Sequence, residues 1–181
     1  SHDVSNKDIF IKIDFRPLKL KIENNSNYNK DKIDGQLSFD LINKDKLVYY
    51  TLNNNILTFK TKIRKFNGEI NIKPFFLSSN LDLNEIEVKK FFKNNSILVN
   101  LLKSEILNNK NFNGKISISA KNLKDLKNIN EIKFDIQFEE GTVLITNLKF
   151  IFKNSVIFNI NDVNLIVDNN NLKFIGDVNM K

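Results

Sequence analysis

The residues that could catalyse a reaction are few and lie far apart in this chain. The single histidine is His2, near the N-terminus, and there is no cysteine, so neither a histidine-based triad nor a thiolate nucleophile is expected. Glu139 and Glu140 are the only adjacent glutamates, and they lie at a predicted turn, where solvated charge is the ordinary explanation. Asp162 and Asp168 have asparagine neighbours, but their surroundings lack the spacing of a calcium loop. We therefore expect no enzyme activity, no metal site and no cofactor.

The composition is that of a folded chain without a charged or membrane-spanning segment. The chain has 181 residues, of which 41% are hydrophobic, enough for a packed core. Its net charge is +7, but the lysines form no dense run, so a nucleic-acid partner is not expected. No apolar run reaches the roughly 18 residues of a membrane-spanning helix. Residues 1–2 resemble the remnant of a cleaved tag, which leaves residues 3–181 as a single β-rich domain.

The C-terminal third is predicted to be a β meander. From Glu131 onward, apolar and polar residues alternate with the period of two that is typical of a strand with one wet face. The alternation breaks at Glu140–Gly141, at Asn154–Ser155 and at Asp168–Asn171, which predicts about four strands joined by tight turns. A change of parity near Asn161–Asp162 indicates a β-bulge.

Strands are also predicted for the N-terminal part, residues 3–83. An exposed, asparagine-rich loop is expected over Asn24–Lys30. The predicted strands, including one that opens the C-terminal part, residues 111–181, cover approximately residues 9–15, 18–23, 32–42, 47–52, 56–63 and 111–120.

A short glycine motif recurs three times, as Asp34-Gly35, Asn67-Gly68 and Asn113-Gly114, each followed by one polar residue and then by alternation. One interpretation is a hairpin turn that leads into a strand, because these dipeptides are strong turn signals. The other is a recurring bulge at the entry of each strand.

A helical segment is predicted between the two β-rich parts, over residues 84–109. Asn84 and Glu87 have the spacing of a helix N-cap and its partner. Apolar residues then recur at helical spacing around Phe91 and again from Ile97 to Leu107. The fold class is therefore mainly β with a minor helical part: a long, curled antiparallel sheet, forming an open groove or a sandwich, with one helical pair near the middle.

The order of these elements carries a resemblance to a known family. The segment Asn67-Gly68-Glu69-Ile70-Asn71-Ile72-Lys73-Pro74-Phe75 leads to Leu81-Asp82-Leu83-Asn84-Glu85-Ile86 and the helical pair. A strand from Asn113 and the hairpin Phe138-Glu139-Glu140-Gly141-Thr142-Val143-Leu144-Ile145 follow. Between Phe66 and Met180 this order resembles the AsmA-like family of Gram-negative bacteria. Glu139–Glu140 departs from the polar residue and asparagine more usual before the hairpin glycine.

The resemblance implies a partly open β structure in the periplasm, belonging to a longer protein anchored at the inner membrane. It implies a role in moving phospholipid between the inner and outer membranes or in outer-membrane biogenesis, with phospholipid acyl chains, and envelope proteins, as partners. An apolar groove would hold the chains. The expected lining residues are Phe134, Ile136, Phe138, Leu148, Phe150, Phe152, Phe158, Ile160 and Phe174.

Two other functions stay open. A structural or protein-binding β domain of the envelope would pack the same side chains into a closed core, whereas an exposed apolar face favours lipid handling. A nucleic-acid-binding β domain rests only on the isoelectric point of about 9.4 and requires a one-sided basic face.

Overall fold

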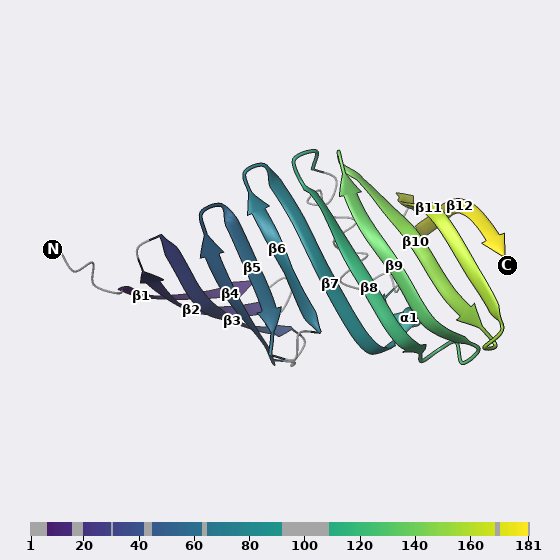
Figure 1. The fold of residues 1–181 in the computed structure, drawn as a ribbon, viewed down its shortest axis with the longest axis horizontal. Helices are drawn as coiled ribbons and strands as arrows, with labels where there is room; N and C mark the ends of the chain where they lie inside the picture. Colours follow the sequence, from purple (N-terminus) through teal and green to yellow (C-terminus); the bar gives the residue numbers. More distant parts are fainter. Residues whose placement is uncertain are drawn as a thin grey trace. The chain divides into compact units, whose positions relative to one another are not determined.

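The computed structural model describes residues 7–15, 20–29, 31–41, 45–62, 65–91, 109–168 and 171–180. These residues form twelve strands and one helical turn (Figure 1). The chain divides into two compact units, Ser1–Pro74 and Phe75–Lys181. The mainly β fold class is confirmed, and each unit is described by itself.

The first unit is an open antiparallel sheet whose strands follow one another in chain order. Its five ladders run without a register shift. Directly opposed residues of neighbouring strands share a face, so each parity stays on one side of this sheet. The strands are β1 (Lys7–Phe15), β2 (Leu20–Asn29), β3 (Lys32–Leu41), β4 (Asp45–Asn53), β5 (Ile56–Thr61) and β6 (Phe66–Ile72).

The second unit is also an open sheet in chain order, but its first ladder differs from the rest. The ladder between β7 and β8 is parallel, whereas the later ladders are antiparallel. Its elements are β7 (Phe75–Ile86), α1 (Val88–Phe91), β8 (Asn113–Leu123), β9 (Ile129–Glu139), β10 (Thr142–Phe152), β11 (Val156–Asp168) and β12 (Asn171–Met180).

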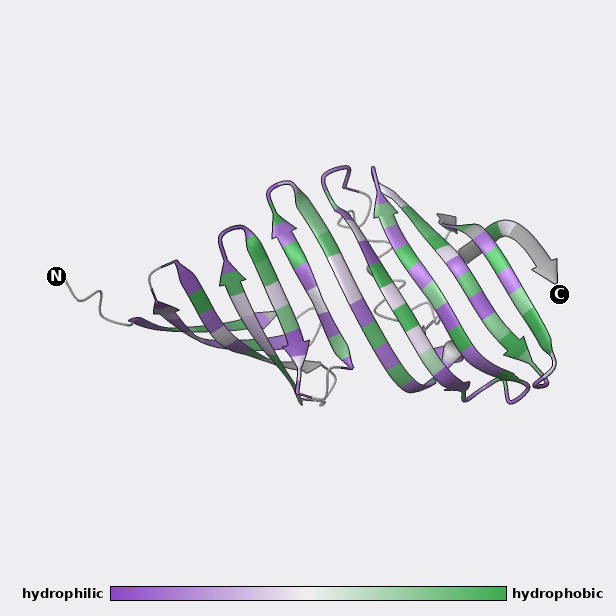
Figure 2. Cartoon of the chain, viewed as in Figure 1, coloured by the Kyte–Doolittle hydropathy of each residue, from purple (hydrophilic) through white to green (hydrophobic). Residues whose placement is uncertain are grey.

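One face of the second unit carries a buried core. Ile116 of β8 lies opposite Ile136 of β9, which lies opposite Ile145 of β10, and Ile145 lies opposite Val163 of β11. Such rows place apolar side chains of four strands on one face, and Figure 2 shows the hydrophobic residues alternating with hydrophilic ones along the strands. The residues buried in this core are Ile86, Ile118, Ala120, Leu123, Ile136, Phe138, Val143, Ile145 and Val163.

Backbone conformation explains the turns of the meander. Glu140 and Gly141 have φ values of 49° and 82°, as a two-residue type I′ hairpin requires. Asn154 also has a positive φ, of 58°. The predicted turns at these two positions are therefore confirmed. Asp168 pairs directly with Asn171, while the middle residues of that turn lie outside the described part of the chain.

Two bulges change which parity is buried in the second unit. The ladder between β9 and β10 shifts register after Thr146 and again after Lys149, beside Asn147 with its φ of 54°. The ladder between β10 and β11 keeps its register here, although Ile145 and Leu148 are successive paired residues of β10. The sequence pattern did not predict this bulge, because apolar residues occur on both parities there. The predicted bulge in β11 is confirmed by a shift between Asn161 and Asn164.

The predicted helical pair is not supported. Asn84 is not a helix N-cap, because β7 continues to Ile86, whose side chain is buried in the core. In the described residues, the helix is limited to the four residues Val88–Phe91. The second apolar stripe, Ile97–Leu107, lies outside the described residues. No helix in the described ranges is long and apolar enough to cross a membrane.

The predicted loop over Asn24–Lys30 is also wrong as far as Asn29, because β2 runs to that residue. β2 pairs on both sides, with β1 and with β3, and these backbone ladders outweigh the low strand propensity of asparagine. Ser26 is buried, and the Asn27 side chain donates a hydrogen bond to Asp8 across the β1–β2 ladder.

The recurring glycines lie within strands and not in turns. A Cβ atom on Gly35 would lie 2.5 Å from the ring of Tyr50, and one on Gly114 would lie 2.6 Å from the backbone oxygen of Leu77. The ladders on both sides of Gly35 show no shift. At these two positions glycine admits a close neighbour, so neither the turn nor the bulge interpretation holds there.

We predict that Gly114→Ala lowers the free energy of unfolding by about 1–3 kcal/mol, because the new methyl group would collide with the backbone of Leu77. Urea denaturation followed by circular dichroism measures the change. Lys121→Ala, at an exposed position of the same strand, is the control and should change stability by less than about 0.5 kcal/mol. Equal effects of the two substitutions would contradict this explanation.

Candidate functional site: an exposed apolar sheet face

Five of the nine expected lipid-groove residues belong to the core of the second unit or pack against it. Ile136 and Phe138 are each 4% exposed. Phe134, Leu148 and Ile160 are partly buried and pack against the same core. In this conformation these side chains contact other parts of the chain.

Three of the expected lining residues form a small aromatic cluster at the β10–β11 ladder: Phe150, Phe152 and Phe158. The rings of Phe150 and Phe158 stack with their centroids 4.8 Å apart. The ring of Phe152 meets Phe158 edge-on, with 6.3 Å between centroids. The backbone of Phe174 pairs with Leu165, but its side chain lies outside the description. The lipid groove expected from these nine residues stays a prediction.

An exposed apolar face occurs instead in the first unit. Ile9, Ile11 and Ile13 of β1 alternate along one side of the strand and are 41%, 48% and 48% exposed. They lie opposite Ser26, Asn24 and Ile22 of β2, respectively.

The unshifted ladders extend this face over all six strands. Ile33 of β3, Leu52 of β4, Leu57 of β5 and Ile70 of β6 form one continuous row. Their side chains are only partly buried, and Val48 of a neighbouring row is buried. We call the following set the apolar face: Ile9, Ile11, Ile13, Ile22, Ile33, Leu37, Val48, Tyr50, Leu52, Leu57, Phe59 and Ile70.

The opposite face of the first unit is mixed: it carries ion pairs, and also the exposed side chains of Phe10, Leu47, Tyr49 and Ile56. Lys12 and Glu23, which lie opposite each other, form an ion pair with 2.7 Å between Nζ and Oε1. The hydrogen bond from Lys12, together with its charge, lowers the pKa of Glu23. Lys32 forms a similar pair with Asp34 at 2.7 Å. The two faces therefore differ in charge, because both of these ion pairs lie on the side opposite the apolar face.

Three polar side chains interrupt the apolar face. The Tyr50 hydroxyl donates to Asn24 Oδ1 at 2.7 Å, and Asn24 Nδ2 donates to Ser26 Oγ at 3.2 Å. Ser26 in turn donates to the backbone oxygen of Ile9 at 3.4 Å. We call Asn24, Ser26 and Tyr50 the polar cluster. Gly35 makes it possible, because the Tyr50 ring crosses β3 over that residue.

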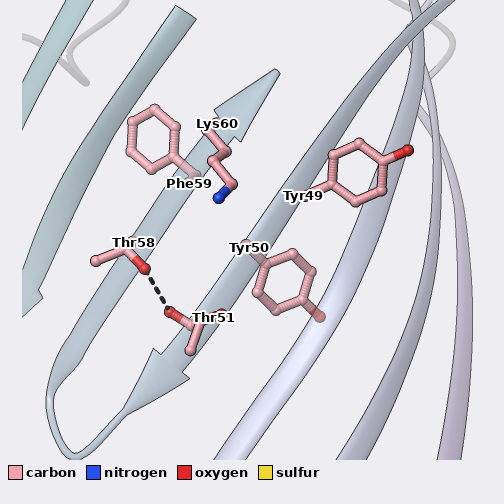
Figure 3. Close-up of a pocket in the computed structure, with 6 residues that line it drawn as sticks. All are labelled: Tyr49, Tyr50, Thr51, Thr58, Phe59 and Lys60. Carbon is pink, nitrogen blue, oxygen red and sulfur yellow. Dashed lines mark hydrogen bonds between the residues drawn. The ribbon is translucent and has the colours of Figure 1, made fainter. Parts of the chain in front are cut away.

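A hollow of about 240 Å³ lies on the β4–β5 ladder (Figure 3). Four of its six lining residues lie on the face opposite the apolar face: Tyr49, Thr51, Thr58 and Lys60. Its volume is below the roughly 300–1,000 Å³ of small-molecule pockets. The hollow is therefore smaller than the usual substrate pocket, and its two other lining residues, Tyr50 and Phe59, belong to the apolar face.

Catalytic or metal chemistry has little support among the described residues. No cluster of three or more histidine, cysteine or acidic side chains occurs there. The Asp135 carboxylate has close polar partners among the described residues: Lys115 Nζ lies 2.9 Å away, and Asn147 Nδ2 donates a hydrogen bond at 2.8 Å. This arrangement satisfies the carboxylate, which suits a structural role.

The pKa of Asp135 reflects opposing effects. Desolvation by burial raises it, but hydrogen bonds from Ser117, Asn147 and Lys115, with the charge of Lys115, outweigh burial and lower the pKa below its ordinary value.

Sequence reasoning found the strand that carries Ile9, Ile11 and Ile13 but did not select it as a site. Its alternation predicts one apolar side, yet a single strand does not reveal whether that side is covered. The signal available in the sequence was the alternation of these isoleucines with Lys12 and Asp14, which indicates a strand with chemically different sides.

Comparisons with protein-family models, with curated proteins and with solved structures found no match to this chain.

We predict that Asp135→Asn lowers the free energy of unfolding by about 1 kcal/mol near neutral pH, because it weakens hydrogen bonds to a carboxylate. A lowered pKa in the folded state means that the stabilisation is complete above the ordinary value of 3.8 and is lost as the pH falls through the folded pKa. Urea midpoints of wild type and variant should therefore converge in acid.

The control is Asp31→Asn, at an exposed position between β2 and β3. A difference between Asp135→Asn and wild type that stayed constant down to the acid limit would contradict the role of the ionised carboxylate.

Proposed function

We propose that this chain is a non-enzymatic, lipid-handling β scaffold that binds phospholipid acyl chains along the apolar face of β1–β6. In this proposal it is an AsmA-like periplasmic segment of a longer, inner-membrane-anchored protein of a Gram-negative envelope, acting in lipid transport or outer-membrane biogenesis. The observation that carries the proposal is the row Ile9, Ile11 and Ile13, each at least 41% exposed on a face that continues over six strands.

The shape and chemistry of the face suit an acyl chain. Aliphatic side chains on alternate residues of a strand form an apolar band, and this band lengthens by about 3.3 Å for each residue of the strand. Burial of apolar area contributes about 25 cal/mol per Å², so roughly 100 Å² in contact with a chain gives about 2.5 kcal/mol. Contact along several strands therefore stabilises binding without a deep pocket. An acyl chain also makes few directional demands, which fits a face made mainly of isoleucine and leucine.

A second candidate function rests on the second unit. Its core residues are 3–6% exposed, which favours a structural or protein-binding β domain in which the apolar side chains contact one another. Under this alternative, the exposed face of the first unit would contact an envelope protein and not a lipid.

We predict that the purified protein carries or takes up phospholipid and that Ile11→Asp abolishes this binding, because a carboxylate in the middle of the β1 row would have to lose its hydration. Native mass spectrometry, followed by organic extraction, measures the bound lipid. Phe10→Asp is the matched control, because Phe10 is 67% exposed on the opposite face of the same strand, and it should leave binding unchanged.

A lipid-free mass together with no uptake of added phospholipid would contradict the proposal and favour the scaffold function. Equal loss of binding in both variants would show that the face of β1 does not matter.

A further inference from the structure

The polar cluster is the one feature of the apolar face that an acyl chain alone does not explain. Asn24, Ser26 and Tyr50 come from two strands and lie in rows that otherwise hold Ile9, Ile11 and other apolar residues. A polar group on an apolar face has a free-energy cost unless it is hydrogen-bonded. Three apolar side chains at these positions would avoid that cost, so the presence of the polar cluster calls for a physical explanation.

The cluster has hydrogen-bonding capacity left over. An asparagine amide has two N–H donors, and within the described part of the chain Asn24 uses one of them, towards Ser26. The Tyr50 hydroxyl has one proton, which it donates to Asn24 Oδ1, so it has no second donor for a ligand. Ser26 is buried, whereas Asn24 and Tyr50 are partly exposed. The available donor of the cluster is therefore the second N–H of Asn24, on a partly exposed side chain of the apolar face.

A free donor within an apolar surface matches an acceptor attached to hydrocarbon. The ester carbonyls of a diacyl phospholipid are such acceptors: each lies where an acyl chain begins and has no proton to donate. A chain along the isoleucines of β1 would bring its own ester oxygen within the span of β1 to β4, over which the cluster extends.

We propose that the polar cluster is an ester-recognition site, in which Asn24 Nδ2 donates a hydrogen bond to an ester carbonyl of a bound diacyl phospholipid, while the hydrogen bond from the Tyr50 hydroxyl holds the Asn24 amide in position. This inference rests on the proposed function and adds a ligand class to it. The apolar face accepts hydrocarbon generally, and the polar cluster selects lipids whose chains are joined by esters.

The test is competition between two lipids in one sample of the full chain. Diester phosphatidylcholine and its diether analogue, with chains of the same length and the same headgroup, are supplied in equimolar amounts, and native mass spectrometry gives the occupancy of each. The diether lacks both carbonyls. We expect the wild type to carry the diester in about 3- to 10-fold excess, the ratio that one hydrogen bond supplies.

The variant Asn24→Leu removes the donor, keeps the side-chain size and should bind the two lipids equally while still carrying lipid. Its matched control is Asn25→Leu, at the exposed neighbouring residue on the opposite face, which should keep the excess of diester. Tyr50→Phe keeps the ring over Gly35 and gives a second reading if Asn24→Leu fails to fold, and its diester excess should be reduced.

The outcomes separate the two proposals. Equal occupancy by both lipids in the wild type overturns ester recognition and leaves acyl-chain binding standing. An undiminished diester excess in Asn24→Leu, or in Tyr50→Phe where Asn24→Leu does not fold, also overturns ester recognition. No binding of either lipid to the wild type overturns the proposed function, and the ester site with it.

Discussion

The first unit depends on one geometric constraint: each strand pairs with the next without a shift of register. Side chains alternate between the two sides of a strand, so an unshifted ladder transmits the parity of one strand to its neighbour. Over six strands this keeps Ile9, Ile11 and Ile13 on the face opposite the ion pairs of Lys12 and Asp34. The chemical difference between the two faces is therefore a property of the ladders, and no single residue creates it.

The same constraint explains Gly35. A side chain at this position would belong to the apolar face, yet the ring of Tyr50 already occupies the space above it. The tyrosine side chain crosses β3 and donates a hydrogen bond to Asn24 on β2. Gly35 therefore allows a side chain of β4 to contact both β3 and β2. Without the glycine, the ring would have to leave β3, and the polar cluster would lose its hydroxyl.

The second unit uses register differently. Its bulges near Asn147 and Asn161 change the buried parity within a strand, which brings Leu148 and Ile160 onto the core that Val143 and Val163 also form. Bulges increase local twist, and a strongly twisted sheet closes on its side chains more readily than a flat one. This contrast agrees with a buried core in the second unit and a half-exposed face in the first.

Local sequence patterns predicted the features that local interactions control. The hairpin at Glu140–Gly141 follows from the positive φ that glycine accepts, and the bulge in β11 follows from a visible change of parity. The patterns failed where distant partners decide. Asn24–Asn29 is a strand because β1 and β3 pair with it on both sides, and the Asn84 segment is a strand because β8 binds it. Whether Ile11 is exposed and Phe138 is buried depends on what covers each sheet face, which alternation does not reveal. Alternation alone therefore could not distinguish a lipid groove from a closed core.

The parallel ladder between β7 and β8 has a consequence for how the chain folds. Hairpins join strands that are close in sequence, but in this ladder contacts such as Asp82 with Ser119 connect residues 37 positions apart. Closing a longer loop loses more chain entropy before any contact compensates for it. The sheet of the first unit can therefore grow from any of its hairpins, whereas the second unit has a slower, non-local step, and the timing of that step governs when its core becomes protected from solvent.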